Sequence, residues 1–131
     1  MRKKSAARPA AAPAFPDEAV VAAKALLRAA QRLGLSNRSL GRIVGLSEAS
    51  VSRMGKGAYT LRRSEKAFEL GLLFIRLFRS LDAIAGGDEA VARAWLHNDN
   101  EALGGKPLKL IETVPGLVNV LAYLDARRAV A

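Results

Sequence analysis

Apolar residues recur every three or four positions along most of this chain, which is the spacing of one face of an α-helix. The first such stretch lies between residues 17 and 34, and we expect its core-facing residues to be Val20, Ala23, Leu27 and Ala30. Further helices are predicted over residues 37–44, 48–54, 62–85, 88–97, 107–112 and 115–128, with a short helical segment at 101–103. Runs of alternating β-branched residues do not break this pattern. The sequence therefore predicts an all-α fold.

The stretch 62–85 differs from the others because it is apolar on two sides. One stripe contains Leu70, Leu73, Phe74, Leu77, Leu81 and Ile84. The second stripe contains Phe68, Leu72, Ile75 and Phe78. A helix that is apolar on two sides is buried on two sides. We expect it to pack on the preceding helices and also on either the C-terminal helices or a second subunit, with Phe68 and Leu72 directed outward.

Residues 39–54 have the pattern of a helix-turn-helix. Two short helices that cross closely require a small residue in the first, here Gly41, and a turn residue that tolerates positive φ, here Gly45. Ser36 and Ser47 are suitable N-caps for the two helices. Residues predicted to fill the wedge between them are Leu40, Val44, Leu46 and Val51. The second helix of this motif enters the major groove of double-stranded DNA.

Candidate DNA contacts follow from this placement. Outward residues of the second helix that can meet base edges are Ser47, Glu48, Ala49, Ser50, Ser52 and Arg53. Residues placed to contact backbone phosphates are Asn37, Arg38, Arg42 and Lys56. Glu48 is equally explained as a partner of the helix dipole in the first turn. One short recognition helix reads few bases, so we expect a homodimer.

Charge divides the chain into two parts. Residues 1–79 contain 16 basic and 5 acidic residues, a net charge of +11, whereas residues 80–131 contain 5 basic and 7 acidic residues, a net charge of −2. A basic N-terminal half is typical of a phosphate-binding module. Residues 1–16 combine Ala and Pro with four cations and no acid, a composition that predicts a flexible basic arm. The predicted layout is this arm, a DNA-binding domain over 17–80 and a second helical domain over 81–131.

Composition argues against several classes of protein. The chain has no Cys and one His, His97, so thiolate chemistry, a metal site and a His-dependent triad have no basis, and we expect neither a cofactor nor an enzyme. Three prolines interrupt the Ala-rich N-terminal stretch, which is therefore not expected to be a signal peptide. The most apolar later stretch, 70–85, carries three charges and is not expected to span a membrane. We expect a cytoplasmic protein.

The C-terminal half contains three unusual segments: Ala94-Trp95-Leu96, Asn100 to Leu108, and Thr113 to Leu121. Following a helix-turn-helix and a hydrophobic bridging helix, these segments make the chain resemble the Xre/MbcA/ParS antitoxin family over roughly residues 17 to 131. The resemblance implies that the C-terminal helices bind and neutralise a toxin, commonly a RES-domain protein that acts on NAD, and that the N-terminal half represses the shared operator. Candidate toxin-contacting residues are Trp95, Asn119, Tyr123, Arg127 and Arg128.

Two further interpretations remain open from the residues alone. The chain could be a stand-alone dimeric regulator whose C-terminal half dimerises or senses a ligand, or an adaptor that uses the helical pair for protein contacts. Arg127 and Arg128 have two explanations as well. On a projecting tail they could occupy the phosphate region of a toxin's NAD site, and in a last helical turn they are favourable partners of the helix dipole.

Overall fold

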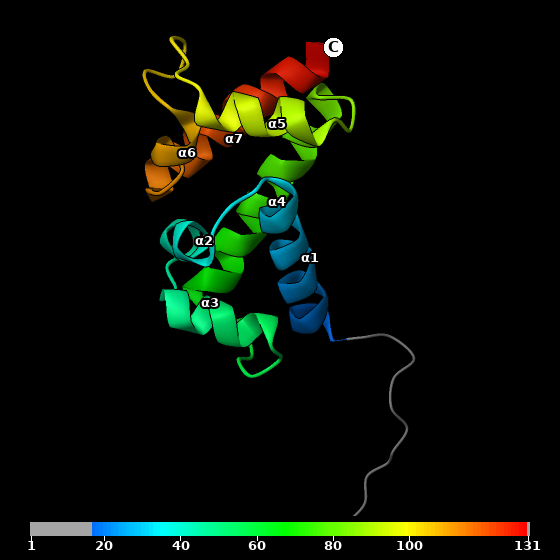
Figure 1. The fold of residues 1–131 in the computed structure, drawn as a ribbon, viewed down its shortest axis with the longest axis vertical. Helices are drawn as coiled ribbons and strands as arrows, with labels where there is room; N and C mark the ends of the chain where they lie inside the picture. Colours follow the sequence, from blue (N-terminus) through cyan, green and yellow to red (C-terminus); the bar gives the residue numbers. More distant parts are fainter. Residues whose placement is uncertain (1–16, 131) are drawn as a thin grey trace, which may run out of the picture.

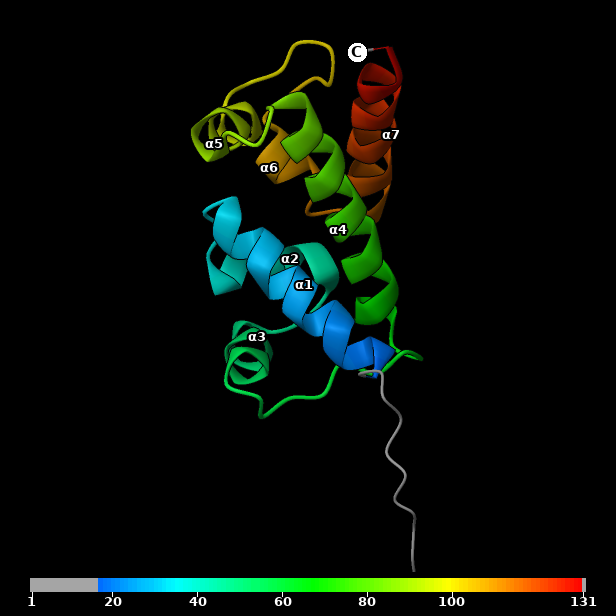
Figure 2. The ribbon, with the colours of Figure 1, turned by 90° about the vertical axis from the view of Figure 1, so that its right-hand side faces the viewer.

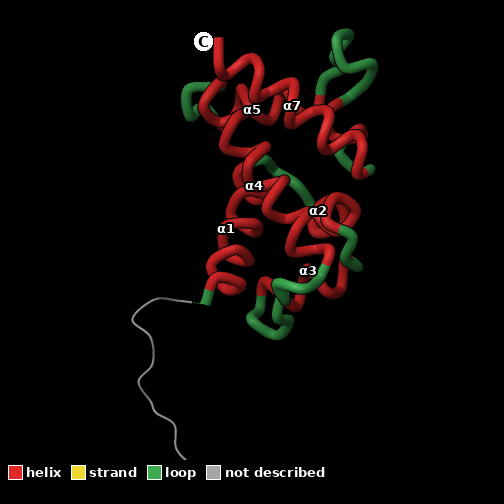
Figure 3. Tube along the Cα trace, turned by 180° about the vertical axis from the view of Figure 1, so that it is seen from behind, coloured by secondary structure: helices red, strands yellow, loops and turns green. Residues whose placement is uncertain are grey.

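The computed structural model describes residues 17–130, and within this range all regular elements are helices (Figures 1 and 3). The predicted all-α fold is therefore confirmed. Residues 1–16, which contain the predicted arm, lie outside the described residues. The helices are α1 (Glu18–Arg32), α2 (Asn37–Val44), α3 (Glu48–Gly55), α4 (Lys66–Ile84), α5 (Glu89–His97), α6 (Pro107–Leu110) and α7 (Val114–Val130).

Helix α1 begins at the N-cap Asp17, whose carboxylate accepts from the Ala19 N–H at 2.9 Å. Its buried face is rotated from the predicted one. The side chains inside the core are those of Ala19, Ala22, Leu26, Ala29 and Ala30. Val20 is 44% exposed, and Ala23 and Leu27 are only partly buried, so the prediction was right for Ala30 alone among four. Because this helix is apolar on more than one side, its periodicity alone did not fix the inward face.

Helix α4 connects the two ends of the molecule (Figure 2). It packs on α1, α2 and α7, and its contacts with α1 extend to Phe78 and Asp82 in its second half. The second partner of this two-striped helix is thus the C-terminal module. Within the second stripe, Phe68 and Ile75 are buried and Phe78 is partly buried, while Leu72 is 42% exposed. The expectation that Phe68 points outward was wrong. Helix α1 covers part of the second stripe, which was considered as a contact surface for a second subunit.

Helix α4 starts at Lys66, four residues later than predicted. The reason is the turn before it, in which Glu65 Oε1 accepts from the Arg62 N–H at 2.8 Å and Glu65 Oε2 accepts from the Tyr59 hydroxyl at 3.0 Å. Glu65 is therefore the extended N-cap residue of α4 and not part of a longer helix. Arg63 in the same turn pairs with Glu18 of α1 at 3.0 Å, which fixes the loop to the start of the chain's first helix.

The C-terminal module consists of the end of α4 with α5, α6 and α7. The predicted inward face of α7 is confirmed, since Leu117, Val120, Leu121 and Leu124 are all buried. In α5 the prediction was partly wrong, because Leu96 is buried and Trp95 is partly buried but Val91 is 52% exposed and Ala92 takes its place in the core. Residues 101–103 form a turn and not a helical segment.

One hydrophobic core runs through both modules. The predicted domain border between residues 80 and 81 lies inside α4, which continues across it without interruption. Phe74, Leu77 and Leu81, on consecutive turns of this helix, are fully or almost fully buried and lie on either side of that border. The two modules are therefore held at a fixed relation by a shared helix.

Candidate nucleic-acid interface and C-terminal surface

The turn between α2 and α3 has the geometry that the two glycines predict. The Gly41 carbonyl accepts from the N–H groups of Gly45 and Leu46 at 2.8 and 2.9 Å. Gly45 is left-handed, with φ +80°, and a Cβ added to Gly41 would collide with the Leu46 carbonyl oxygen. Leu40, Val44 and Val51 are buried between the helices, and Leu46 is partly buried, as predicted. This is a helix-turn-helix.

Each of its two helices begins with the same serine pair. Ser36 Oγ accepts from the Ser39 N–H, and Ser47 Oγ accepts from the Ser50 N–H, both at 3.0 Å. Each capping hydroxyl also donates to the hydroxyl of its partner, at 3.2 Å in α2 and 2.9 Å in α3. The N-terminal amides of both helices are thus partly satisfied by short local contacts.

Helix α3 presents a polar ridge away from the core. Arg53 Nη2 donates to Ser50 Oγ at 3.2 Å, so the row Ser47, Ser50 and Arg53 is linked by hydrogen bonds along one face. Ser50 is half-buried, whereas Arg53 is exposed. The structure places the other predicted base-contacting residues on the accessible part of α3 as well; Glu48 and Ala49 are exposed, and Ser52 is half-buried.

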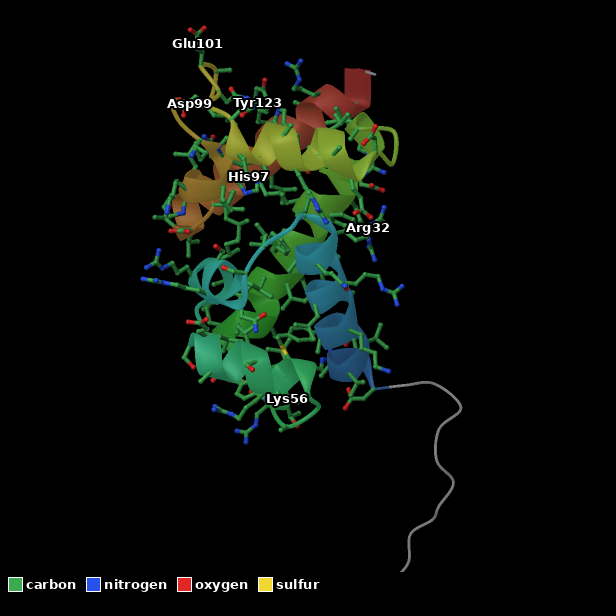
Figure 4. The ribbon with its side chains drawn as sticks, in the orientation of Figure 1. Arg32, Lys56, His97, Asp99, Glu101 and Tyr123 are labelled. Atoms are coloured by element: carbon green, nitrogen blue, oxygen red, sulfur yellow. The ribbon has the colours of Figure 1, made fainter. Side chains whose placement is uncertain are left out.

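Of the predicted phosphate contacts, three are exposed, and within residues 17–130 their side chains make no ion pair or hydrogen bond to the protein: Asn37, Arg38 and Lys56. Lys56 lies at the end of α3, at the extremity of the molecule opposite the C-terminal helices (Figure 4). Arg42 differs, because its Nη1 lies 4.0 Å from Glu112 Oε1 in the connection between α6 and α7. Its guanidinium is thus shared with the C-terminal module.

At the other end of the molecule, three of the predicted toxin-contacting residues form one cluster. The rings of Trp95 in α5 and Tyr123 in α7 are stacked, with centroids 6.3 Å apart and planes 23° from parallel. The Arg127 guanidinium lies 5.3 Å from the centre of the Tyr123 ring and donates to its hydroxyl at 3.1 Å. Asn119 is exposed one turn before Tyr123. We call Trp95, Tyr123 and Arg127 the aromatic cluster.

Arg128 points to a different place. Its Nη1 donates to Ser80 Oγ at 3.4 Å, and the same buried hydroxyl donates to Asp125 Oδ1 at 2.6 Å. Asp125 also pairs with Arg76 at 3.2 Å. Helix α7 extends through Val130, so both arginines lie within the helix and not on a projecting tail. This is the second of the two positions that the sequence left open for them, the last turn of a helix.

The segment Asn100 to Leu108 is a closed loop with a local explanation for its residues. Asn100 Oδ1 accepts from the Leu103 N–H at 3.0 Å, and the Asn100 and Gly105 backbones pair in both directions. Gly104 is left-handed, with φ +81°. Pro107 is the first residue of α6, where its missing N–H is not required. A Cβ on Gly116 would collide with the Leu110 carbonyl, so this glycine permits the tight turn from α6 into α7.

Comparison with known families matches a domain in each half of the chain. Residues 12–76 match the antitoxin Xre-like helix-turn-helix domain, and residues 80–129 match the antitoxin Xre/MbcA/ParS C-terminal toxin-binding domain. The chain belongs to the Xre-type antitoxin family. A comparison with curated proteins found no match. The family match confirms the resemblance seen in the sequence, and it assigns the DNA-binding and toxin-binding parts of this antitoxin to its N-terminal and C-terminal halves.

Sequence reasoning missed the contacts that join these halves of the antitoxin. Arg93 of α5 donates to the backbone carbonyl oxygens of Arg32 at 2.9 Å and Gln31 at 3.2 Å, at the end of α1. Arg32 pairs in turn with Glu89 at 3.2 Å and with Asp82 at 3.6 Å (Figure 4). The only signal was the acidic excess of residues 80–131, which could have suggested partners for N-terminal arginines.

Other polar residues of the antitoxin have structural roles. Asp88 caps α5 through the Ala90 and Val91 N–H groups, and His97 ends α5 with Nδ1 2.8 Å from the Arg93 carbonyl, as expected for a helix-end residue. Over residues 17–130 no group of three metal-binding side chains comes together. None of the helices in this range has the length and apolar character required to cross a bilayer.

One carboxyl group in the helix-turn-helix half has a shifted pKa. The Arg62 N–H, and then the Tyr59 hydroxyl, hold the pKa of Glu65 below its ordinary value. Burial, followed by the hydrogen bond to Glu65, raises the pKa of Tyr59 above its ordinary value. Both shifts favour ionised Glu65 as acceptor and neutral Tyr59 as donor near neutral pH. The pair stabilises the turn between α3 and α4.

Proposed function

We propose that this antitoxin represses the promoter of its own operon as a homodimer and neutralises a RES-domain toxin that acts on NAD. The observation that carries the proposal is the separation of its two surfaces. The α3 ridge and the aromatic cluster lie at opposite ends of a body built around α4, as the positions of Lys56 and Tyr123 show (Figure 4). A chain so arranged can hold DNA and toxin together.

On the DNA side, the proposed base-reading residue is Arg53. A guanidinium can donate two parallel hydrogen bonds to guanine O6 and N7. Its contact with Ser50 restricts the side chain before DNA arrives, which lowers the entropy lost on binding. Ser50 thus acts as a positioning residue in the free protein. The homodimer follows from the small reach of one eight-residue recognition helix, since two copies together can read two half-sites.

On the toxin side, the proposed contact surface is the aromatic cluster with Asn119. Stacked aromatic rings next to an arginine are typical of residues that contribute strongly to protein interfaces. Arg127 is exposed beside this stack, and its guanidinium could engage the anionic pyrophosphate region of an NAD site. Arg128 would have to leave Ser80 to do the same. The favourable position of both arginines in the last turn of α7 is the competing explanation.

Two variants test whether the toxin contact and the operator contact are separate. Deleting residues 127–131 should abolish rescue of cells that express the toxin, while promoter repression in a reporter assay is retained. Arg53→Ala should weaken operator binding by about 1–3 kcal/mol and leave rescue unchanged. Lys56→Ala is the matched control, since loss of a phosphate contact weakens binding to all DNA sequences about equally.

The outcomes separate the parts of the proposal. A truncated chain that folds, binds the toxin and still rescues cells would show that the last turn of α7 is not needed to block the toxin's NAD site. An Arg53→Ala protein with full operator affinity would show that α3 does not read the operator. A promoter-binding protein whose neighbouring gene product is harmless when expressed alone would point instead to a stand-alone regulator.

A further inference from the structure

A groove runs along the seam between α1 and α4, on a surface that neither proposed function uses. Two adjoining hollows, of about 340 and 320 Å³, share four lining residues and form one continuous depression. The shared residues are Val21, Ala25, Ile75 and Arg79. Figure 2 shows the two helices that flank it side by side. We call this depression the α1–α4 groove.

The floor of the α1–α4 groove is apolar and accessible. Val21 on α1 is 47% exposed and Leu72 on α4 is 42% exposed, and both line the groove. Phe78 and Ala29 continue the floor toward the other end. The α1 residues that line it run from Glu18 to Ala29, which corresponds to about 17 Å or three helical turns. The groove therefore has the length and apolar character that suit one short helix.

The rims of the groove are positively charged on both sides. Lys24 and Arg28 stand four residues apart on α1, and Arg76 and Arg79 stand three residues apart on α4. Like charges at these spacings destabilise a helix slightly, so helix stability does not explain them. Among residues 17–130, no carboxylate lies within 4.0 Å of Lys24, Arg28 or Arg79.

The acidic groups close to the groove are already engaged. Glu18 at one end pairs with Arg63 at 3.0 Å, and Asp125 pairs with Arg76 at 3.2 Å. A second copy placed groove to groove would bring the same cations face to face, because a two-fold interface joins identical patches. Residues 1–16 contain four cations and no acid, so they would also be repelled. The occupant must bring its own carboxylates.

From this geometry we propose that the α1–α4 groove docks an acidic amphipathic helix of another protein. About three turns of that helix would place one apolar stripe on Val21 and Leu72. Carboxylates on both flanks of the stripe would face Lys24 and Arg28 on one side and Arg79 on the other. The apolar floor favours a protein helix over a nucleic-acid backbone, which would need cations without an apolar strip between them.

The probe for this surface is a fluorescein-labelled peptide of about 14 residues, with Leu at every third or fourth position and Glu on both flanks. A scrambled peptide of identical composition lacks the apolar stripe. The full-length antitoxin should bind the first peptide saturably below about 1 mM in fluorescence anisotropy and should not bind the scrambled one. Arg28→Glu combined with Arg79→Glu should weaken binding at least about tenfold.

Matched variants decide the interpretation. Lys106→Glu with Lys109→Glu changes the net charge equally at exposed positions of the C-terminal module, and it should leave peptide affinity unchanged. Val21→Glu should weaken peptide binding because it places a charge on the apolar floor of the groove. Circular dichroism checks that this variant is still folded. The proposal is overturned if the peptide with the apolar stripe does not bind. It is also overturned if the Lys106 and Lys109 variant loses as much peptide affinity as the Arg28 and Arg79 variant. Loss of DNA affinity in the Arg28 and Arg79 variant without peptide binding would make the groove a nucleic-acid contact.

Discussion

Arg93 offers the sharpest test of how the toxin-binding half is tied to the DNA-binding half. Its guanidinium donates to two carbonyl oxygens at the end of α1, at 2.9 and 3.2 Å, and lies 3.4 Å from Glu89. These carbonyls belong to the last turn of α1, where the Gln31 carbonyl also accepts from the Gly34 N–H at 3.0 Å. Replacing Arg93 with Ala removes both donors and a positive charge from the negative end of the α1 dipole. The variant should therefore be less stable.

The magnitude follows from the contacts. A hydrogen bond to a charged group contributes about 1.5–3 kcal/mol when it is sheltered, but the Arg93 side chain is 46% exposed and water competes for the same carbonyls. At such a site each hydrogen bond contributes about 0.5 kcal/mol to the free energy of unfolding. The positive charge at the helix end adds about 0.3–1 kcal/mol. The expected loss is about 1–2 kcal/mol, which for a chain of this size lowers Tm by roughly 3–8 °C.

Thermal unfolding followed by circular dichroism measures this loss. Arg93→Lys should recover the charge but not the forked donor geometry, and its Tm should lie between those of Arg93→Ala and the parent. Lys109→Ala is an exposed control that should change Tm little. The reasoning is refuted if Arg93→Ala melts within about 1 °C of the parent, or if the Lys variant is as unstable as the Ala variant.

Three further predictions concern single features of the antitoxin. Gly41→Ala should lower the free energy of unfolding by about 1–3 kcal/mol and weaken operator binding, because its methyl meets the Leu46 carbonyl; Gly55→Ala, with open space around it, should be neutral or stabilising. Glu65→Gln should lower Tm, and the difference from the parent should be larger at neutral pH than at acidic pH. The depressed pKa makes the contribution of Glu65 complete above its unfolded pKa, so the difference from the parent should shrink as pH falls below about 4; a constant difference would contradict this role. Removing residues 1–16, with their four cations, should flatten the slope of log K against log salt by up to about four units per subunit, and an unchanged slope would show that these cations do not reach phosphates.

The helix-turn-helix could be recognised from the sequence because its determinants are local. Gly41, Gly45, Ser36 and Ser47 act on backbone groups within a few residues of themselves, so their types and spacing predict the same geometry that the structure shows. Such contacts leave a short-range pattern in the sequence, and helix caps and turns were therefore predictable.

Contacts between distant elements left no comparable pattern. The Arg32 side chain meets Glu89, which is 57 residues away, and Arg128 meets Ser80 at a distance of 48 residues. Nothing local distinguishes these arginines from cations that face solvent or phosphate. Arg42 is an example, since its predicted role is a phosphate contact and the sequence did not indicate that its guanidinium also lies 4.0 Å from Glu112.

The sequence by itself determined the all-α class, the order of the helices and the position of the second helix of the helix-turn-helix, because helical periodicity and capping are properties of neighbouring residues. Only the tertiary structure decided which side of α1 is buried and where the Arg128 side chain points. Helix α1 has apolar residues on several sides, so its orientation depends on the volume that α4 offers to Leu26, next to Gly71. Packing between elements, and not propensity within them, makes that choice.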